Sequence, residues 1–269
     1  MIYIGCSGWS YPEWKGIFYT GTGDMFRQYA TYFNAVEINS TFYQMPSEEI
    51  VTAWIKKARP LKHFRFSVKM WSEITHHHMM SNPGAAIGDL ERFMSTVIEP
   101  LKRENLLSAC LVQLPPYFKR SDMESLTSLL EQARTTEVSY SVEFRHPTLY
   151  GDTTAIEELA AINVSTVSID SPASLIRKIY TAGSVAYVRL HGRNYETWKT
   201  AEGMEKYLYR YSKAEITEIA ELIRSTGTTS DLLIFFNNHP QGNAPLNALE
   251  LMGALGVNRP SDSSQQRLF

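Results

Sequence analysis

The sequence predicts an α/β protein with a single (β/α)8 TIM barrel. Eight short apolar segments with the pattern of strands recur along the 269 residues, and nearly all are followed by a helical pattern. The length is close to the roughly 250 residues typical of that barrel. Six of the strands carry a polar face at their carboxyl ends, where TIM barrels place their sites. A doubly wound sheet is the alternative, but its strands are usually apolar on both faces.

Side chains alternate across a strand, and this pattern defines the expected strands. The second strand, which begins at Ala35, is expected to stay extended as far as Tyr43, so that Glu37, Asn39 and Thr41 share a polar face. The eight strands are Ile2–Cys6, Ala35–Ile38, Phe64–Met70, Cys110–Leu114, a strand that starts at Ser139, Val164–Asp170, Val185–His191 and Leu232–Phe236.

Helices are expected between these strands, from apolar residues at helical spacing and from capping residues. They cover approximately Met25–Phe33, Pro46–Ala58, Ala85–Asn105, Ser121–Ala133, Thr154–Ile162, Glu215–Ser225 and Pro245–Leu255. No linker or repeat divides the chain, so residues 1–257 are expected to form one domain. Residues 258–269 are polar and are expected to be a disordered tail.

The composition argues against several classes of partner. Lys and Arg total 26 against 28 Asp and Glu, a net charge of −2, so any attraction to nucleic acid must be local. No apolar run is long enough to span a bilayer, and no signal peptide is recognisable. Cys6 and Cys110 lie in strand patterns and are expected to be reduced and buried, which indicates a cytoplasmic protein that does not bind membranes. The oligomeric state is not predicted.

The strand beginning at Ser139 carries the clearest chemical signal. Tyr140 and Val142 share its apolar face, whereas Glu143 and Arg145 leave the strand side by side on the other. Similar polar ends occur on five other strands. A structural ion network, with pairs such as Glu143–Arg189 and Asp170–Arg145, is one interpretation of these residues. A ligand site is the other, and we prefer it because barrel interiors are normally filled by Val, Ile and Leu.

The candidate site residues come from the strand ends and the loops that follow them. The catalytic candidates are Glu37, Glu143 and His191, with the two carboxylates as a general acid/base pair and the histidine as a proton carrier. Cationic side chains would bind an anion, and amides would orient it. The substrate-binding candidates are Trp9, Asn39, Lys69, Gln113, Arg145, Asp170, Arg189, Asn237, Asn238 and Gly242.

No metal or cofactor is predicted. The run His76-His77-His78 is expected to form a solvated loop, because adjacent histidines do not converge easily on one ion and the run lacks the spacing of a zinc helix. The acids at the strand ends could hold one hard cation, but the neighbouring arginines and Lys69 already supply positive charge. Nearby carboxylates would raise the pKa of Lys69, which disfavours a Schiff-base role.

The turn after the last strand suggests where an anion could bind. Pro245 suits the first turn of a helix, and Gly242 allows the backbone to approach a ligand closely. The free N–H groups of such a helix attract anions. We therefore expect phosphate or sulfate between Arg189 and this turn.

At these residues the chain resembles a known family. The segments are Ser7-Gly8-Trp9, Val36–Tyr43, Phe66–Lys69 with Ile74–His76, Gln113–Pro116, Val142–His146, Tyr187–Gly192, and Phe236–Asn238 with Gly242, Ala244-Pro245 and Asn247-Ala248. Together they are similar to the YecE-like family, also called the domain of unknown function 72, over about residues 2–257. The resemblance implies a TIM barrel related in shape to endonuclease IV and xylose isomerase, without a known reaction. Cys6 stands where many relatives have Thr, and His239 where Asp is usual, which weakens any metal site taken over from fold relatives.

The sequence thus predicts an enzyme acting on a small anionic substrate, such as a phosphorylated sugar or a nucleotide fragment, as a hydrolase, lyase or isomerase. A nucleic-acid-binding barrel resembling endonuclease IV is the alternative, although the zinc ligands of that enzyme type are poorly matched. A non-catalytic ligand-binding protein is the third interpretation.

Overall fold

The structure, a computed structural model, describes residues 1–133, 138–200, 203–227 and 230–260. Its eight strands form one sheet in the order β1-β8-β7-β6-β5-β4-β3-β2, in which β1 neighbours β8 and the strands from β2 to β8 follow their order along the chain. This order and the alternation with helices are those of a TIM barrel, so the predicted fold class is confirmed. The strands are β1 (Ile2–Cys6), β2 (Ala35–Ile38), β3 (Arg65–Lys69), β4 (Leu107–Gln113), β5 (Tyr140–Glu143), β6 (Ser165–Asp170), β7 (Ala186–Leu190) and β8 (Leu232–Phe236).

The helices fall between the strands. The α-helices are α1 (Met25–Tyr32), α2 (Ser40–Tyr43), α3 (Glu48–Ala58), α4 (Pro83–Phe93), α5 (Glu99–Arg103), α6 (Met123–Ala133), α7 (Thr153–Ala161), α8 (Tyr195–Thr200), α9 (Lys213–Thr226) and α10 (Asn243–Leu255). Two π-helical segments are η2 (Glu73–His78) and η3 (Met94–Ile98). Short 3₁₀ turns are η1 (Pro12–Trp14), η4 (Arg120–Asp122), η6 (Pro147–Leu149), η7 (Gly203–Tyr207) and η8 (Pro240–Gly242).

The chain divides into two compact units. Unit 1 comprises Met1–Glu37, Ser168–Ile179 and Tyr187–Phe269, and unit 2 comprises Ile38–Val167 and Tyr180–Ala186. The single domain over residues 1–257 therefore stays a prediction. Of the predicted tail, residues 261–269 lie outside the described residues.

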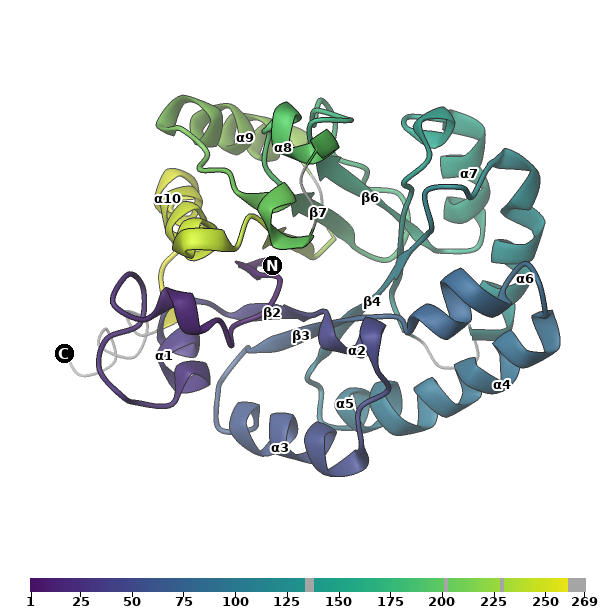
Figure 1. Ribbon diagram of the computed structural model, residues 1–269, viewed down its shortest axis with the longest axis horizontal. Helices are drawn as coiled ribbons and strands as arrows, with labels where there is room; N and C mark the ends of the chain where they lie inside the picture. Colours follow the sequence, from purple (N-terminus) through teal and green to yellow (C-terminus); the bar gives the residue numbers. More distant parts are fainter. Residues whose placement is uncertain (134–137, 201–202, 228–229, 261–269) are drawn as a thin grey trace. The chain divides into compact units, whose positions relative to one another are not determined.

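Unit 1 has an aromatic core beside the β1–β8 pair. β1 and β8 run parallel, with Ile4 opposite Ile234. Tyr29 of α1 is buried; its hydroxyl donates to the carbonyl of Ala35 at 2.8 Å and accepts from the N–H of Cys6 at 2.7 Å. These bonds satisfy backbone groups that would be costly to bury unpaired. α9 and α10 pack side by side (Figure 1).

Unit 2 is built on the parallel neighbours β3, β4 and β5. Lys69 lies opposite Leu111, and Gln113 lies opposite Glu143. The carboxyl ends of β3, β4 and β5 therefore lie side by side at one edge of unit 2. Behind them, Phe64 and Phe66 are buried in perpendicular contact, with ring centroids 5.4 Å apart.

The predicted extension of the second strand to Tyr43 is wrong. β2 ends at Ile38, and Asn39 has helical dihedral angles (φ −93°, ψ −16°) before α2 begins. The hydroxyl of Thr41 donates to the carbonyls of Ile38 at 3.1 Å and Lys69 at 2.6 Å. Threonine hydroxyls compete with ladder bonding in this way, so the segment turns instead of remaining extended. Glu37, Asn39 and Thr41 consequently do not share one strand face.

Two connections also differ from expectation. The helix expected over residues 85–105 begins at Pro83 and passes through the π-helical segment η3 before α5. The histidine run, expected as a loop, forms the π-helix η2.

Gly5 provides a test of the packing between β1 and β2. A Cβ at this position would overlap the carbonyl of Ala35 and the hydroxyl of Tyr29. Overpacking of this kind forces the backbone to move, so Gly5→Ala should lower the free energy of unfolding by about 3 kcal/mol in urea titrations.

Gly253 of α10 is the matched control, because a Cβ there would meet nothing within 4 Å. Gly253→Ala should raise stability by about 0.5–1 kcal/mol, since alanine favours the helix. Equal effects of the two substitutions would contradict the packing described for β1.

Candidate functional site

A connected polar row crosses the carboxyl ends of β3, β4 and β5 in unit 2. The ammonium of Lys69 donates to Oε1 of Gln113 at 2.7 Å. The amide nitrogen of Gln113 donates to Oε1 of Glu143 at 2.8 Å. The parallel register produces this row, because each residue ends its own strand beside the next. Gln113 thus joins a cation to a carboxylate through the two ends of one amide.

Arg145 completes the row. It lies two residues beyond Glu143, and its guanidinium contacts the same carboxylate oxygen. The Glu143 side chain is fully buried, and that of Arg145 is 16% exposed. A buried carboxylate requires such partners, because an isolated charge in a low-dielectric interior is strongly disfavoured.

Phe42 of α2 packs on Lys69. The Lys69 ammonium lies 3.5 Å from the centroid of the Phe42 ring, the geometry of a cation–π contact. This contact forms because β2 ends at Ile38 and the following helix α2 turns Phe42 back toward β3. Lys69 is therefore held by Phe42 on one side and Gln113 on another.

His76 of η2 adjoins the same cluster. Its ring lies edge-on to Phe42, with centroids 4.9 Å apart, and its Nδ1 is 2.8 Å from the hydroxyl of Thr75. Burial, and then the positive charges of Lys69, His77 and Arg145, lower the pKa of His76 to about 4. At neutral pH this imidazole is uncharged and lies in a positive electrostatic environment. π-Helical turns such as η2 frequently occur at functional sites.

In unit 1, Glu37 is the centre of a separate buried cluster. Its carboxylate accepts hydrogen bonds from Ser7 Oγ at 2.8 Å, the Tyr187 hydroxyl at 2.7 Å and Arg189 Nη2 at 2.8 Å. Both Glu37 and Arg189 are at most 1% exposed. Three donors engage the two oxygens of Glu37, which takes up most of the roughly four acceptor sites of a carboxylate and fixes its orientation.

Asp170 holds the segments that follow β6 and β7. Arg193 approaches it with two nitrogens, Nε at 2.9 Å and Nη2 at 3.1 Å, and the Tyr211 hydroxyl donates at 2.8 Å. The N–H of Ile176 adds a fourth bond at 2.9 Å. Burial, followed by the Asp170 charge, raises the pKa of Tyr211 well above its ordinary value. These contacts favour a structural role for Asp170 over direct substrate binding.

His191 and the two asparagines after β8 lie near one another in unit 1. Nδ2 of Asn237 is 3.1 Å from Nδ1 of His191. The His191 ring also adjoins Tyr207, with centroids 5.9 Å apart. The side chain of Asn238 instead donates to Oδ1 of Asn247 at 3.0 Å, which ties the loop to α10. Asn237 is thus placed to orient His191, whereas Asn238 braces the loop.

The remaining candidates are less directly placed at a site. Trp9 packs edge-on against Phe26 of α1 at 5.3 Å. Asn39 is half-buried and precedes α2. Gly242 has a left-handed backbone (φ 69°), and a Cβ there would meet Ile17 at 2.9 Å, so Ile17 lies close to the turn where phosphate was expected.

Sequence reasoning missed several partners that complete these clusters. Tyr187 and Arg193 were not among the candidates, although each contacts a candidate carboxylate. Tyr187 lies two residues before Arg189 on β7, and the period of a strand could have placed both on one face. The contact of Arg193 with Asp170 depends on loop conformation, for which the sequence carried no signal.

The described residues contain no group of three or more His, Cys, Asp or Glu side chains that could hold a metal ion. Within the same described part of the chain, no helix is both long and apolar enough to cross a membrane.

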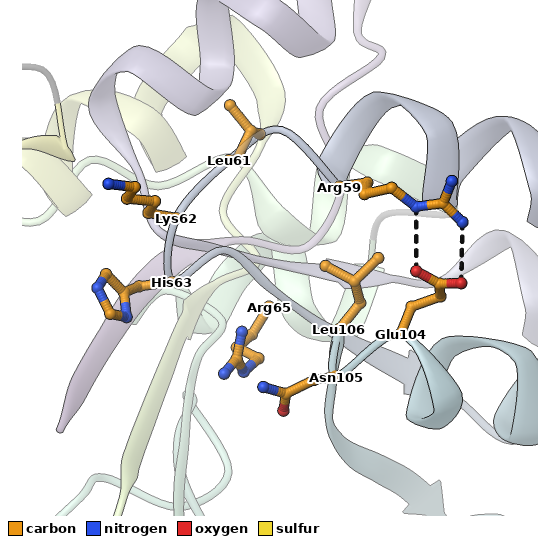
Figure 2. Close-up of a pocket in the computed structure, with 8 residues that line it drawn as sticks. All are labelled: Arg59, Leu61, Lys62, His63, Arg65, Glu104, Asn105 and Leu106. Atoms are coloured by element: carbon orange, nitrogen blue, oxygen red, sulfur yellow. Dashed lines mark hydrogen bonds and ion pairs between the residues drawn. The ribbon is translucent and has the colours of Figure 1, made fainter.

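A pocket of about 300 Å³ lies at the opposite, amino-terminal ends of β3 and β4 (Figure 2). Its main interaction is the exposed pair of Arg59 and Glu104, joined at 3.0 and 2.8 Å. Figure 2 shows Lys62 and His63 on the far side of the pocket from this pair. Because TIM barrels place their sites at the carboxyl ends of the strands, we do not take this pocket as the active site.

The profile of the family described as "Protein of unknown function DUF72" matches residues 3–267. The chain belongs to this family. The chain is also similar to UPF0759 protein YunF of Bacillus subtilis, which is 24% identical over 96% of this chain and 95% of its own length. YecE of Escherichia coli is 31% identical over 56% of this chain and 50% of its own length. A crystal structure of a DUF72 protein from Thermotoga maritima is 31% identical, covers 95% of this chain and 99% of its own, and superposes with a TM-score of 0.83.

The buried Glu37–Arg189 pair of this DUF72 chain should be sensitive to neutralisation. Glu37→Gln removes the charge that the buried Arg189 guanidinium contacts at 2.8 Å, and breaking such a pair costs about 3–5 kcal/mol. Urea unfolding should show this loss. Glu104→Gln removes the partner of the exposed Arg59 in Figure 2 and should cost at most about 1 kcal/mol. Losses of similar size would contradict the buried pairing.

His76 should make stability depend on pH. Its pKa is lowered on folding, so the unfolded chain binds more protons between pH 7 and 4, and stability must fall as the pH falls through this window. His76 is partly exposed, so we expect its share at pH 4 to be about 1–3 kcal/mol. His76→Gln should flatten the curve of unfolding free energy against pH by that amount. Parallel curves for the two proteins would contradict this assignment.

Proposed function

We propose that this protein is an enzyme that binds a small phosphorylated substrate at the Lys69–Gln113–Glu143–Arg145 row and acts on it by acid–base chemistry. The observation that carries the proposal is the row itself. It joins two cations, an amide and a carboxylate through consecutive contacts at the carboxyl ends of three neighbouring strands. The ends of these strands are where TIM barrels bring their chemical groups together.

The cationic side chains support an anionic substrate. The planar guanidinium of Arg145 suits two oxygens of a phosphate, and the Lys69 ammonium acts as a point charge. The same two cations also act on His76, because after burial the charges of Lys69, His77 and Arg145 lower the pKa of its imidazole, and they would attract an anion to the same place.

Glu143 is the acid–base group of the proposal. Its carboxylate is buried and already held by Gln113 and Arg145, so its orientation is fixed before a substrate arrives. A substrate anion that engages Arg145 would weaken the hold on the carboxylate and leave Glu143 better able to accept a proton. Gln113 positions both Glu143 and Lys69.

The proposal rests on unit 2 alone. Within unit 1, Glu37 and Asp170 hold neighbouring side chains through at least three hydrogen bonds each, so we assign them positioning roles there. The role of His191, whose Nδ1 lies 3.1 Å from Nδ2 of Asn237, as a proton carrier stays a prediction from the sequence.

Sulfate is a suitable probe of the anion site, because it is tetrahedral and stays a dianion at low pH. A concentration ten times its Kd should raise the melting temperature of the wild type by about 2–4 °C. In NMR titrations, a nearby sulfate should raise the pKa of His76 by about 1–3.

Lys69→Met should abolish both responses. The control is Lys56→Met, which makes the same change at an exposed lysine of α3 and should respond like the wild type. This control separates binding from the general stabilisation of proteins by sulfate. Equal responses of the Lys69 and Lys56 variants would overturn the proposed anion site.

A further inference from the structure

Two strongly exposed tyrosines of unit 2 lie next to the charged row. Tyr43 ends α2 and is 77% exposed, and Tyr117 follows β4 and is 53% exposed. Single exposed aromatic residues are common on protein surfaces. These two differ from scattered ones because short chains of contacts link each of them to the proposed anion site.

Tyr43 is linked to Lys69 through Phe42. The rings of Tyr43 and Phe42 are perpendicular, with centroids 5.2 Å apart, and the Lys69 ammonium is 3.5 Å from the Phe42 centroid. The exposed ring and the buried cation are therefore separated by one aromatic side chain. This spacing is of the same order as that between the phosphate and the base of one nucleotide.

Tyr117 is linked to the same cluster through His76. Its hydroxyl donates to the His76 carbonyl at 2.7 Å, and the His76 ring lies 4.9 Å from Phe42. The hydrogen bond fixes where the Tyr117 ring projects and leaves much of that ring exposed. Phe42 and His76 thus form an aromatic floor with an exposed tyrosine at either end.

We propose that the substrate bound by this site is a nucleoside monophosphate unit, with its phosphate on Lys69 and Arg145 and its base stacked on Tyr43. This inference rests on the proposed function and specifies its substrate class. Cations that hold phosphate beside aromatic rings that stack on bases are the usual means of binding unpaired nucleotides. A sugar phosphate has no aromatic face that could stack on the two tyrosines. The nucleoside monophosphate could be a free nucleotide or the unpaired end of a nucleic-acid strand.

Calorimetric titrations of the full chain with adenosine 5′-monophosphate, ribose 5-phosphate and inorganic phosphate test the inference. Stacking of one base should make the nucleotide bind about tenfold more tightly than ribose 5-phosphate. Tyr43→Leu should lower the affinity for the nucleotide to that for ribose 5-phosphate. The affinity for ribose 5-phosphate should stay unchanged. Tyr43→Phe keeps the aromatic face and should bind like the wild type.

Tyr195→Leu is the control for an exposed tyrosine elsewhere, because Tyr195 of unit 1 is 55% exposed. It should not change any of the three affinities. If Lys69 is needed for all three ligands but the nucleotide binds no better than ribose 5-phosphate, the inference is overturned and the proposed function stands. If none of the three binds, both are overturned.

A hexamer of deoxythymidine distinguishes the two sources. A nucleic-acid strand is supported as the source if the hexamer binds more tightly than the mononucleotide, if its affinity falls steeply with salt, and if Tyr43→Leu abolishes its binding. Hexamer binding no tighter than mononucleotide binding would support the free nucleotide. Hexamer binding that is unaffected by both Tyr43→Leu and Lys69→Met would overturn the assignment of nucleotide recognition to this site.

Discussion

The burial of the Glu143 carboxylate is the constraint on which the architecture of the candidate site depends. A charge with no exposure to water must be compensated by neighbouring groups. Arg145 supplies the opposite charge, and Gln113 supplies a hydrogen bond whose other end reaches Lys69. Compensation of one charge thereby fixes four side chains, three at the ends of β3, β4 and β5 and the fourth, Arg145, just beyond β5. Their positions are set before any ligand binds, as acid–base and anion-binding groups require.

The two units handle buried charge differently. In unit 1, Glu37 and Asp170 each accept several hydrogen bonds, which connect side chains from strands and loops. In unit 2, two cations share a network with Glu143 beside a neutral His76. The unit 1 clusters hold neighbouring side chains in place. The unit 2 row keeps an excess of positive charge that an anionic ligand could contact. This difference is the reason for assigning ligand binding to unit 2.

Local backbone irregularities bring the aromatic residues to the charged row. The Thr41 hydroxyl bonds to the carbonyls of Ile38 and Lys69, and the chain turns into α2 at that point. Phe42 then lies on Lys69, whereas in an extended strand its side chain would have stood on the sheet face opposite to that of Thr41. The π-helix η2 places His76 against the same ring. A regular strand and a plain loop, as the sequence suggested, would not have produced this aromatic floor.

The sequence by itself determined the eight strands, the fold class and the family, because hydrophobic periodicity and motif composition are local properties. It also singled out Lys69, Gln113, Glu143 and Arg145 as candidates, since polar residues at or just after the ends of apolar strands stand out against the pattern; their role in a site stays a prediction. Only the tertiary structure decided the partners: Arg193 for Asp170, Tyr187 and Ser7 for Glu37, and Phe42 and His76 for Lys69 and its cluster. Such pairings depend on strand register, loop conformation and the competition of several donors for one buried acceptor. These are relations between distant segments, and no local pattern in the sequence records them.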